Sequence, residues 1–311
     1  MTGVRALQPT AFSIGRQAYE RIELAKWPGS VHSCYGGAIN VQTGLGLVCL
    51  VPRGAGRGPL NINLDAEALA RAGDMASGSP VDRSVKGLVF KNGFRLTLSN
   101  AEIFEPTGRF DSPALRPRKI ERNISTARDI ALLMGHLEGV GELLKAIGGS
   151  PSAPPMGPFS AAALPRVKRL LRAIGARDRG GAREVAKGLA GLGIGLTPAA
   201  DDMLSGIMVS LVLGSLNGIG ADDISEVVPW IADSCRGRTS DLSYEFLLQA
   251  ASGRANERIT RLVEAIYTGT ASEVRTATLD TIAIGETSGT DAVTGVVLGA
   301  KTAIATAELA A

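Results

Sequence analysis

Two stretches of this sequence carry the same pattern of residues that could bind a small anion. Both read Gly-x-Thr-x-x-x-Asp, from Gly195 to Asp201 and from Gly285 to Asp291, and each opens a segment with helical spacing. A glycine-rich loop that runs into a helix start leaves backbone N–H groups unpaired at the positive end of the helix dipole, where anions bind. Two such helix starts facing each other would hold a small anionic substrate.

Asp201 and Asp291 end this repeated pattern and are the predicted catalytic carboxylates. Each lies four residues after a threonine, which is about one helical turn, so its side chain should face the same side as that threonine. Such carboxylates can orient a neutral N–H group of a substrate or bind a metal. We expect replacement of Asp201 with asparagine to reduce turnover and to spare the fold.

The first of the two loops contains more glycine than a helix cap requires. Thr197 is predicted to be the N-cap and Pro198 the first helical residue. The glycines and the two adjacent aspartates indicate close approach of a ligand, whereas the alternative is that the glycines only let helices pack closely. The loop is not a dinucleotide-binding fingerprint, because the spacing before it is that of a helix. The predicted substrate-binding residues of the two loops are Gly193, Gly195, Thr197, Asp202, Thr287, Ser288 and Gly289.

Arg238 and Thr239 stand before another predicted helix. The planar guanidinium group suits a carboxylate or a phosphate, so Arg238 is predicted to be catalytic and Thr239 to bind substrate. The alternative is a capped surface helix with an exposed arginine. His32 is a further substrate-binding candidate, with a position in the core or at the rim of a site. Adjacent residues on a strand point to opposite faces, so we do not expect His32 to activate Ser33.

The segment from Val31 to about Pro106 is predicted to form an antiparallel β domain. The dipeptide Asn92-Gly93 is typical of a β-hairpin, since both residues tolerate positive φ. The strand patterns cover residues 38–41, 45–51, 60–64, 88–90 and 94–98.

The rest of the chain has apolar residues at helical spacing. This spacing predicts one helix from Ile120 to Ile147, and the four prolines between Ser150 and Pro158 predict a loop or lid. Further helices are predicted over residues 160–174, 181–190, 198–213, 224–234, 240–251, 258–267, 271–284 and 290–309. The predicted fold class is α+β, with a β-rich N-terminal domain over residues 1–115 and an α-helical C-terminal domain over residues 116–311 that carries the glycine-rich and Asp-Asp motif.

Composition narrows the class of protein. A chain of 311 residues favours two domains, and a net charge of +3 with scattered basic residues argues against a nucleic-acid partner. Three cysteines without metal-ligand spacing favour a reducing cytoplasm and no disulfide framework. No segment is predicted to span a membrane, and no cofactor or metal ligand is predicted, with Mg²⁺ as the alternative.

Taken together, these segments resemble the AllH-like family, formerly a domain of unknown function. The main match is the run from Gly191 to Asp202, with a glycine-rich loop, Leu-Thr-Pro, a small pair and Asp-Asp. The supporting matches are His32-Ser33 with Asn40, Asn100-Ala101 before Pro106, Arg238-Thr239 with Leu242-Ser243, and Gly285 to Asp291 with Gly295.

The resemblance implies a subunit of oxamate carbamoyltransferase, an assembly with three kinds of subunit, in allantoin breakdown. The implied reaction joins oxalurate and phosphate to give oxamate and carbamoyl phosphate. In this reading the two loops bind the anionic groups, Arg238 fixes a carboxylate or phosphate, and Asp201 and Asp291 orient the carbamoyl NH₂. The chain departs from the family where Ala199-Ala200 replaces the usual Ser-Gly, which bears on the exact substrate. Relatives also occur beside other purine, urea or amide degradation genes.

Two other classes of function stay open. One is a metal-dependent hydrolase of a small amide or ureide, with Asp201, Asp202 and Asp291 as oxygen ligands, although adjacent residues of a helix point about 100° apart and do not easily share one ion. The other is a non-catalytic subunit that completes the active site of a partner. The absence of a convincing nucleophile and base in the sequence favours the latter.

Overall fold

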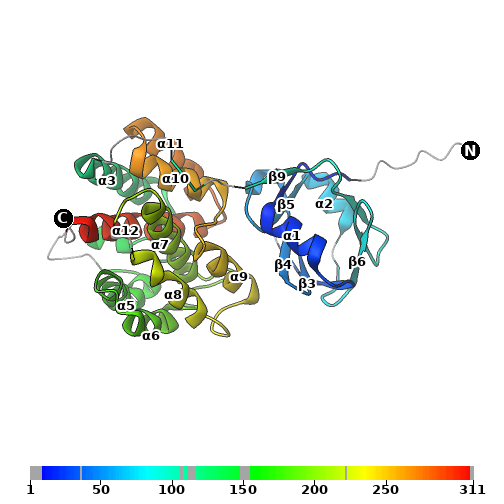
Figure 1. Cartoon of the computed structure of the whole chain (residues 1–311), viewed down its shortest axis with the longest axis horizontal. Helices are drawn as coiled ribbons and strands as arrows, with labels where there is room; N and C mark the ends of the chain where they lie inside the picture. The colour runs from blue at the N-terminus through cyan, green and yellow to red at the C-terminus, as the bar shows by residue number, and fades with distance from the viewer. Residues whose placement is uncertain are drawn as a thin grey trace, which may run out of the picture. The chain divides into compact units, whose positions relative to one another are not determined.

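The computed structural model of the chain contains two compact units, residues 1–106 and 107–311. It describes residues 9–35, 37–73, 75–105, 108–110, 116–147, 155–220 and 223–308. The N-terminal unit is built on a sheet and the C-terminal unit is helical (Figure 1). The predicted α+β class is therefore confirmed.

The N-terminal unit is a curled sheet of nine strands in the order β8-β7-β6-β2-β3-β4-β5-β1-β9. A bridge between Thr10 and Thr97 joins the segment before β1 to β8, so the two ends of the sheet curl towards each other around an apolar core. The helices of this unit are α1 (Arg16–Leu24) and α2 (Ala66–Ala72). The strands are β1 (Ser13–Gly15), β2 (Gly29–Tyr35), β3 (Ala38–Thr43), β4 (Gly46–Pro52), β5 (Asn61–Leu64), β6 (Pro80–Ser84), β7 (Gly87–Phe90), β8 (Arg95–Thr97) and β9 (Glu102–Phe104).

The sheet is mixed, and the expectation of a purely antiparallel domain is wrong. Strands β4 and β5 pair in parallel, as do β1 and β9. The eight residues between β4 and β5 form the crossover connection between these parallel strands. Their sequence has no long helical pattern, so the sequence did not indicate a crossover.

The predicted hairpin at Asn92-Gly93 is present between β7 and β8, with a three-residue loop. The Phe90 N–H donates to the Phe94 carbonyl oxygen at 2.9 Å, and Gly93 alone in the loop has positive φ, at 89°. The Asn92 side chain instead accepts a hydrogen bond from the Phe94 N–H at 3.0 Å.

The helices predicted after residue 160 are confirmed in the C-terminal unit. A 3₁₀ turn over Ile224–Glu226 precedes α8 and accounts for part of the predicted helix there. The helices of the unit are α3 (Pro117–Met134), α4 (Leu143–Ala146), α5 (Pro158–Gly175), α6 (Arg179–Leu189), α7 (Ala199–Leu216), α8 (Val228–Ser234), α9 (Asp241–Ala250), α10 (Glu257–Thr268), α11 (Ala271–Ile282) and α12 (Ser288–Glu308). Most of the predicted proline-rich loop, residues 150–154, lies outside the described residues.

The predicted long helix from Ile120 to Ile147 is wrong, because α3 ends at Met134 and α4 begins at Leu143. Glycines cause the break: a Cβ on Gly135 or Gly141 would lie less than 3 Å from the side chain of Thr290 in α12. The chain leaves the helix at Gly135 and wraps around the start of α12.

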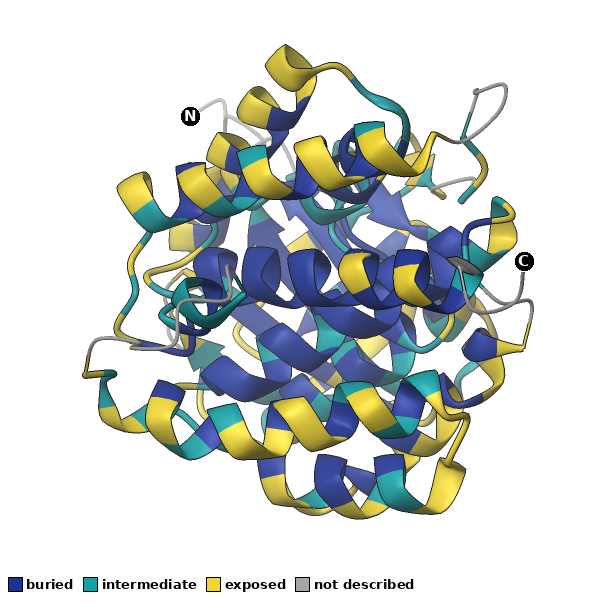
Figure 2. Cartoon of the chain, turned by 90° about the vertical axis from the view of Figure 1, so that its left-hand side faces the viewer, coloured by how far each residue is buried: buried dark blue, intermediate teal, exposed yellow. Residues whose placement is uncertain are grey.

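Helices α7 and α12 form the centre of the helical unit. Figure 2 shows buried helices in its middle and partly exposed helices around them. The two helices run parallel and touch backbone to backbone, since a Cβ on Gly206 would overlap the Ala292 carbonyl oxygen and one on Gly295 would overlap that of Met203. Among the described helices, α7 has the length and hydropathy of a membrane span, but 78% of that stretch is buried inside the protein, as in a core helix.

Candidate functional site

The glycine-rich loop before α7 is a tight turn packed against its neighbours. Gly191, Gly193 and Gly195 have φ of 79°, 134° and 97°, a region that favours glycine. A Cβ on Gly191 would overlap the Arg238 carbonyl oxygen, and one on Gly193 would overlap the Ala199 nitrogen, whereas Gly195 has open space around it. Two of the three glycines thus serve close packing of the chain on itself.

The start of α7 lies one residue later than the sequence indicates. Pro198 is the N-cap and Ala199 the first helical residue, so the prediction of Thr197 as N-cap is wrong. The Ala200 N–H donates to the Leu192 carbonyl oxygen at 2.9 Å, which satisfies one of the first N–H groups within the loop. Thr197 is freed from capping and lies against α12, with its Oγ1 at 3.3 Å from Ser288 Oγ. The two helix starts therefore lie side by side.

Asp201 uses both carboxylate oxygens within the chain. Its Oδ1 accepts from the Gly191 N–H at 3.0 Å, and its Oδ2 accepts from the hydroxyls of Thr239 and Ser243, the latter at 2.9 Å. Burial raises the pKa of Asp201, and these three hydrogen bonds lower it. Asp201 consequently ties the glycine-rich loop and the start of α9 to α7.

Asp202 and Asp291 differ from Asp201 because each has one carboxylate oxygen without a hydrogen bond to the described residues. In the part of the chain that the structure describes, Oδ2 of each is enclosed and has no hydrogen-bond partner. Asp291 is fully buried, and its Oδ1 accepts from the Val140 N–H at 2.7 Å. Buried polar atoms without a partner are rare in folded proteins and call for an explanation, such as a bound ligand, an ion or a catalytic role.

Burial raises the pKa of both carboxyl groups. Burial raises the pKa of Asp202 well above its usual range, hydrogen bonds from Ser288 and Thr197 lower it, and the charge of Asp291 raises it further. Burial also raises the pKa of Asp291 to about 7, against hydrogen bonds from Val140 and Thr287. Both shifts favour the protonated forms of the two carboxyl groups, and a protonated carboxyl group can donate its proton to a substrate group.

The loop between α3 and α4 completes this site from a third side. A Cβ on Gly139 would overlap the carboxylate of Asp291, and the His136 N–H donates to Thr290 Oγ1 at 3.0 Å. The signal for this loop was visible in the spacing of Gly135, Gly139 and Gly141, which interrupts a helical pattern.

Arg238 and Thr239 have different surroundings. Thr239 reaches Asp201, as described above. Arg238 is exposed, and it contributes to the lowered pKa of Glu184 on α6 after the hydrogen bond and charge of Lys187 and the charge of Arg183. The paired-helix site consists of Thr197, Asp202, Thr287, Ser288 and Asp291 and does not include Arg238.

Comparison with protein families covers both units of the chain. Residues 189–300 match the family model described as oxamate carbamoyltransferase subunit AllH, and residues 10–103 match the model described as AllH family N-terminal domain. The chain belongs to the AllH family. Its role is that of a subunit of a carbamoyltransferase, which implies other protein subunits. No curated protein and no solved structure matches the chain.

The AllH match at 189–300 contains the glycine-rich loop, α7 and the start of α12. The AllH N-terminal match contains His32, which lies on β2 in the other unit. There the Nδ1 atom of His32 is 3.1 Å from Ser33 Oγ. The expectation that strand geometry keeps these two side chains apart is wrong, because β2 has a register shift between Val31 and Ser33.

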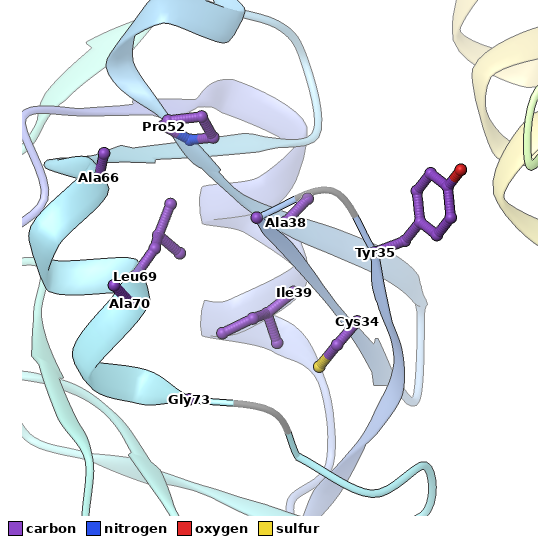
Figure 3. A pocket seen from close by; sticks show the side chains of 10 residues that line it. Cys34, Tyr35, Ala38, Ile39, Pro52, Ala66, Leu69, Ala70 and Gly73 are labelled. Atoms are coloured by element: carbon purple, nitrogen blue, oxygen red, sulfur yellow. The ribbon is translucent and has the colours of Figure 1, made fainter.

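The AllH N-terminal unit also holds a cavity of about 640 Å³ between α2 and the hairpin of β2 and β3 (Figure 3). Leu69 and Ile39 point into it, and Cys34 lies at its edge. None of the site residues predicted from the sequence lines it.

Proposed function

We propose that this chain carries the carbamoyl-binding part of the transferase site, at the paired-helix site. The proposed reaction is transfer of a carbamoyl group between oxalurate and phosphate, giving oxamate and carbamoyl phosphate. The observation that carries the proposal is the pair of enclosed carboxyl oxygens on Asp202 and Asp291 that have no hydrogen-bond partner among the described residues. A ureido group offers N–H donors that match such acceptors.

The surroundings of the pair suit a small anion with an amide end. The starts of α7 and α12 lie together, so the positive ends of two parallel helix dipoles add. The carboxylate or phosphate of the substrate would lie at these helix starts, near the hydroxyls of Thr197 and Ser288, and its carbamoyl NH₂ would reach Asp202 and Asp291. In this assignment Asp202, rather than Asp201, is the α7 carboxyl group that contacts the substrate.

The chemistry needs a proton donor. Phosphate oxygen attacks the carbamoyl carbon, the bond from that carbon to the oxamate nitrogen breaks, and this nitrogen must gain a proton to leave as an amide. Burial raises the pKa of Asp202 well above its usual range, which favours the protonated form, and a protonated carboxyl group can supply that proton. We assign this donation to Asp202 and the orientation of the carbamoyl NH₂ to Asp291; in the reverse direction Asp202 accepts the proton.

Thermal unfolding of the full chain with each small molecule tests the site directly. Phosphate, carbamoyl phosphate, oxamate and oxalurate are compared, each with and without Mg²⁺. A ligand at a hundredfold its dissociation constant stabilises by about 2.7 kcal/mol, which is roughly 5–10 °C for a unit of about 200 residues. We expect a shift with carbamoyl phosphate or oxalurate in the wild type and in Asp280→Asn, an exposed control on α11, and none in Asp291→Asn.

A shift that survives Asp291→Asn would place binding elsewhere. No shift with any of the four molecules would mean that partner subunits complete the site, and the measurement is then repeated on the assembled enzyme.

A metal-dependent hydrolase is the second candidate, and the same two oxygens favour it. Among the residues that the structure describes, no three His, Cys, Asp or Glu side chains come together. Mg²⁺ often uses only one or two carboxylates and keeps several waters, and the Asp202 and Asp291 pair offers that number. A thermal shift that requires Mg²⁺ would favour this candidate over carbamoyl transfer.

A further inference from the structure

The N-terminal unit has a second group of polar side chains that could do chemistry. Strand β2 carries a register shift between Val31 and Ser33, which interrupts the alternation of side chains at this point. As a result His32 and Ser33, adjacent in sequence, have Nδ1 and Oγ atoms 3.1 Å apart. Both residues are half-buried.

Asn40 on β3 sets the direction of the Ser33 hydroxyl. Ser33 and Asn40 are paired across the two strands, and Asn40 Nδ2 donates to Ser33 Oγ at 3.0 Å. Asn40 is almost fully buried, with 2% of its surface exposed, so its amide is held in place. With one lone pair of Ser33 Oγ occupied by Asn40, the hydroxyl proton can point to Nδ1 of His32 when that histidine carries its own proton on Nε2.

We propose that Ser33 is a nucleophilic serine, with His32 as its general base and Asn40 as the positioning residue. The substrates would be small carbonyl compounds with a good leaving group, such as activated esters and acyl phosphates. Ser33 Oγ bonds to the carbonyl carbon, its proton moves to His32 Nδ1, and the bond from that carbon to the leaving group breaks. The product is an O-acyl serine, which water can later hydrolyse. This activity goes beyond the proposed carbamoyl transfer and does not depend on it.

The arrangement keeps this group separate from the neighbouring cavity. Cys34 and Ile39 are also paired across β2 and β3, and they lie at the cavity shown in Figure 3. Neighbouring pairs along two strands face opposite sides of the sheet, so Ser33 and Asn40 face away from that cavity. Labels on Ser33 and on Cys34 would therefore report reaction on opposite faces of the sheet.

The test is acylation of the full chain by p-nitrophenyl acetate. Release of nitrophenolate gives the rate, and peptide mapping by mass spectrometry locates the acetyl group. We expect a stoichiometric burst with the label on Ser33. Ser33→Ala should abolish the burst, and His32→Gln should slow it by a hundredfold or more, the usual contribution of a general base. Ser30→Ala changes a half-buried serine on the same strand and should leave the burst intact.

Two results would overturn the proposal. One is acetylation spread over lysines and cysteines with Ser33 unlabelled, and the other is an unchanged burst in His32→Gln. Thermal unfolding of each variant shows whether it is folded. Asn40→Ala tests the positioning role, which predicts a slower burst with the label still on Ser33. Because the readout needs neither oxalurate nor phosphate, its failure is distinguishable from failure of the carbamoyl-transfer proposal.

Discussion

The starts of α7 and α12 share a sequence pattern but use their aspartates differently. At α12 the aspartate four residues after the threonine is Asp291, and one of its carboxylate oxygens makes no hydrogen bond to the described residues. At α7 the corresponding residue, Asp201, is fully engaged with Gly191, Thr239 and Ser243, and its neighbour Asp202 takes the equivalent position.

The crossing of the two helices explains this one-residue offset. Gly206 and Gly295 are the points of backbone contact, and they follow Asp202 and Asp291 by four residues each. Equal distance from the contact places Asp202 and Asp291 at the same height on parallel helices. The packing of helix against helix, rather than the repeated motif, thus decides which carboxyl groups meet.

The largest effect is expected from a substitution that forces α7 and α12 apart. Gly295→Ala places a Cβ on the Met203 carbonyl oxygen, and we expect it to lower the free energy of unfolding of the helical unit by about 4 kcal/mol. Chemical denaturation measures the loss. Gly180→Ala, inside α6 with its nearest neighbour at an ordinary 3.5 Å, should change stability by less than about 1 kcal/mol. Equal effects of the two changes would contradict the close contact.

Replacement of Asp201 should act on stability. In Asp201→Asn an NH₂ group replaces one acceptor oxygen that binds Gly191 or the two hydroxyls, so we expect a loss of about 3 kcal/mol in the free energy of unfolding. This revises the expectation from sequence that the change spares the fold. Urea denaturation decides, and a variant as stable as the wild type would restore Asp201 as a candidate for catalysis.

Replacement of Asp202 should act on turnover. Asp202→Asn removes the proposed proton donor, and we expect the rate of carbamoyl transfer by the assembled enzyme to fall about a hundredfold. The free energy of unfolding should change little, because the amide has the size of the carboxyl group and one Asp202 oxygen makes no hydrogen bond to the described residues. A turnover within a factor of two of the wild type would remove Asp202 from the mechanism.

The pH dependence of stability tests Asp291. Its pKa is raised to about 7 in the folded protein, above the unfolded value of about 4, so the folded state binds the proton more tightly. Stability should therefore fall as pH rises through this range, by about 2 kcal/mol between pH 5 and pH 8. Denaturation at several pH values should show this slope in the wild type and a smaller one in Asp291→Asn. An identical slope in both proteins would assign it to other groups.

The smallest effect belongs to the contact between the two helix starts. Thr197 Oγ1 and Ser288 Oγ are 3.3 Å apart and partly exposed, so a double-mutant cycle of Thr197→Val and Ser288→Ala should give a coupling of less than about 1 kcal/mol in unfolding. A larger coupling would indicate that the hydrogen bonds of Thr197 and Ser288 to the Asp202 carboxyl stabilise the fold jointly.

Much of the helical unit was predictable because its helices have clear apolar spacing and its glycines mark the ends. The break after Met134 was missed: Gly135, Gly139 and Gly141 interrupt the helical spacing, but the need for glycine there appears only in the packing on Thr290 and Asp291. The α12 aspartate was identified from the motif, whereas the distinction between Asp201 and Asp202 depends on Thr239 and Ser243, some forty residues away in sequence. The contact of His32 with Ser33 depends on a β-bulge, which a single strand pattern does not reveal.

The pairing of α7 with α12 also constrains how the protein is made. Helix α7 is apolar on nearly every side, and its partner is the last helix of the described chain. During synthesis α7 leaves the ribosome some seventy residues before α12 begins. In that interval the apolar surface of α7 lacks its main packing partner. A chain that stops before Ser288 would leave the apolar surface of α7 without its main packing partner, and we expect such a chain to be bound by chaperones and degraded by proteases.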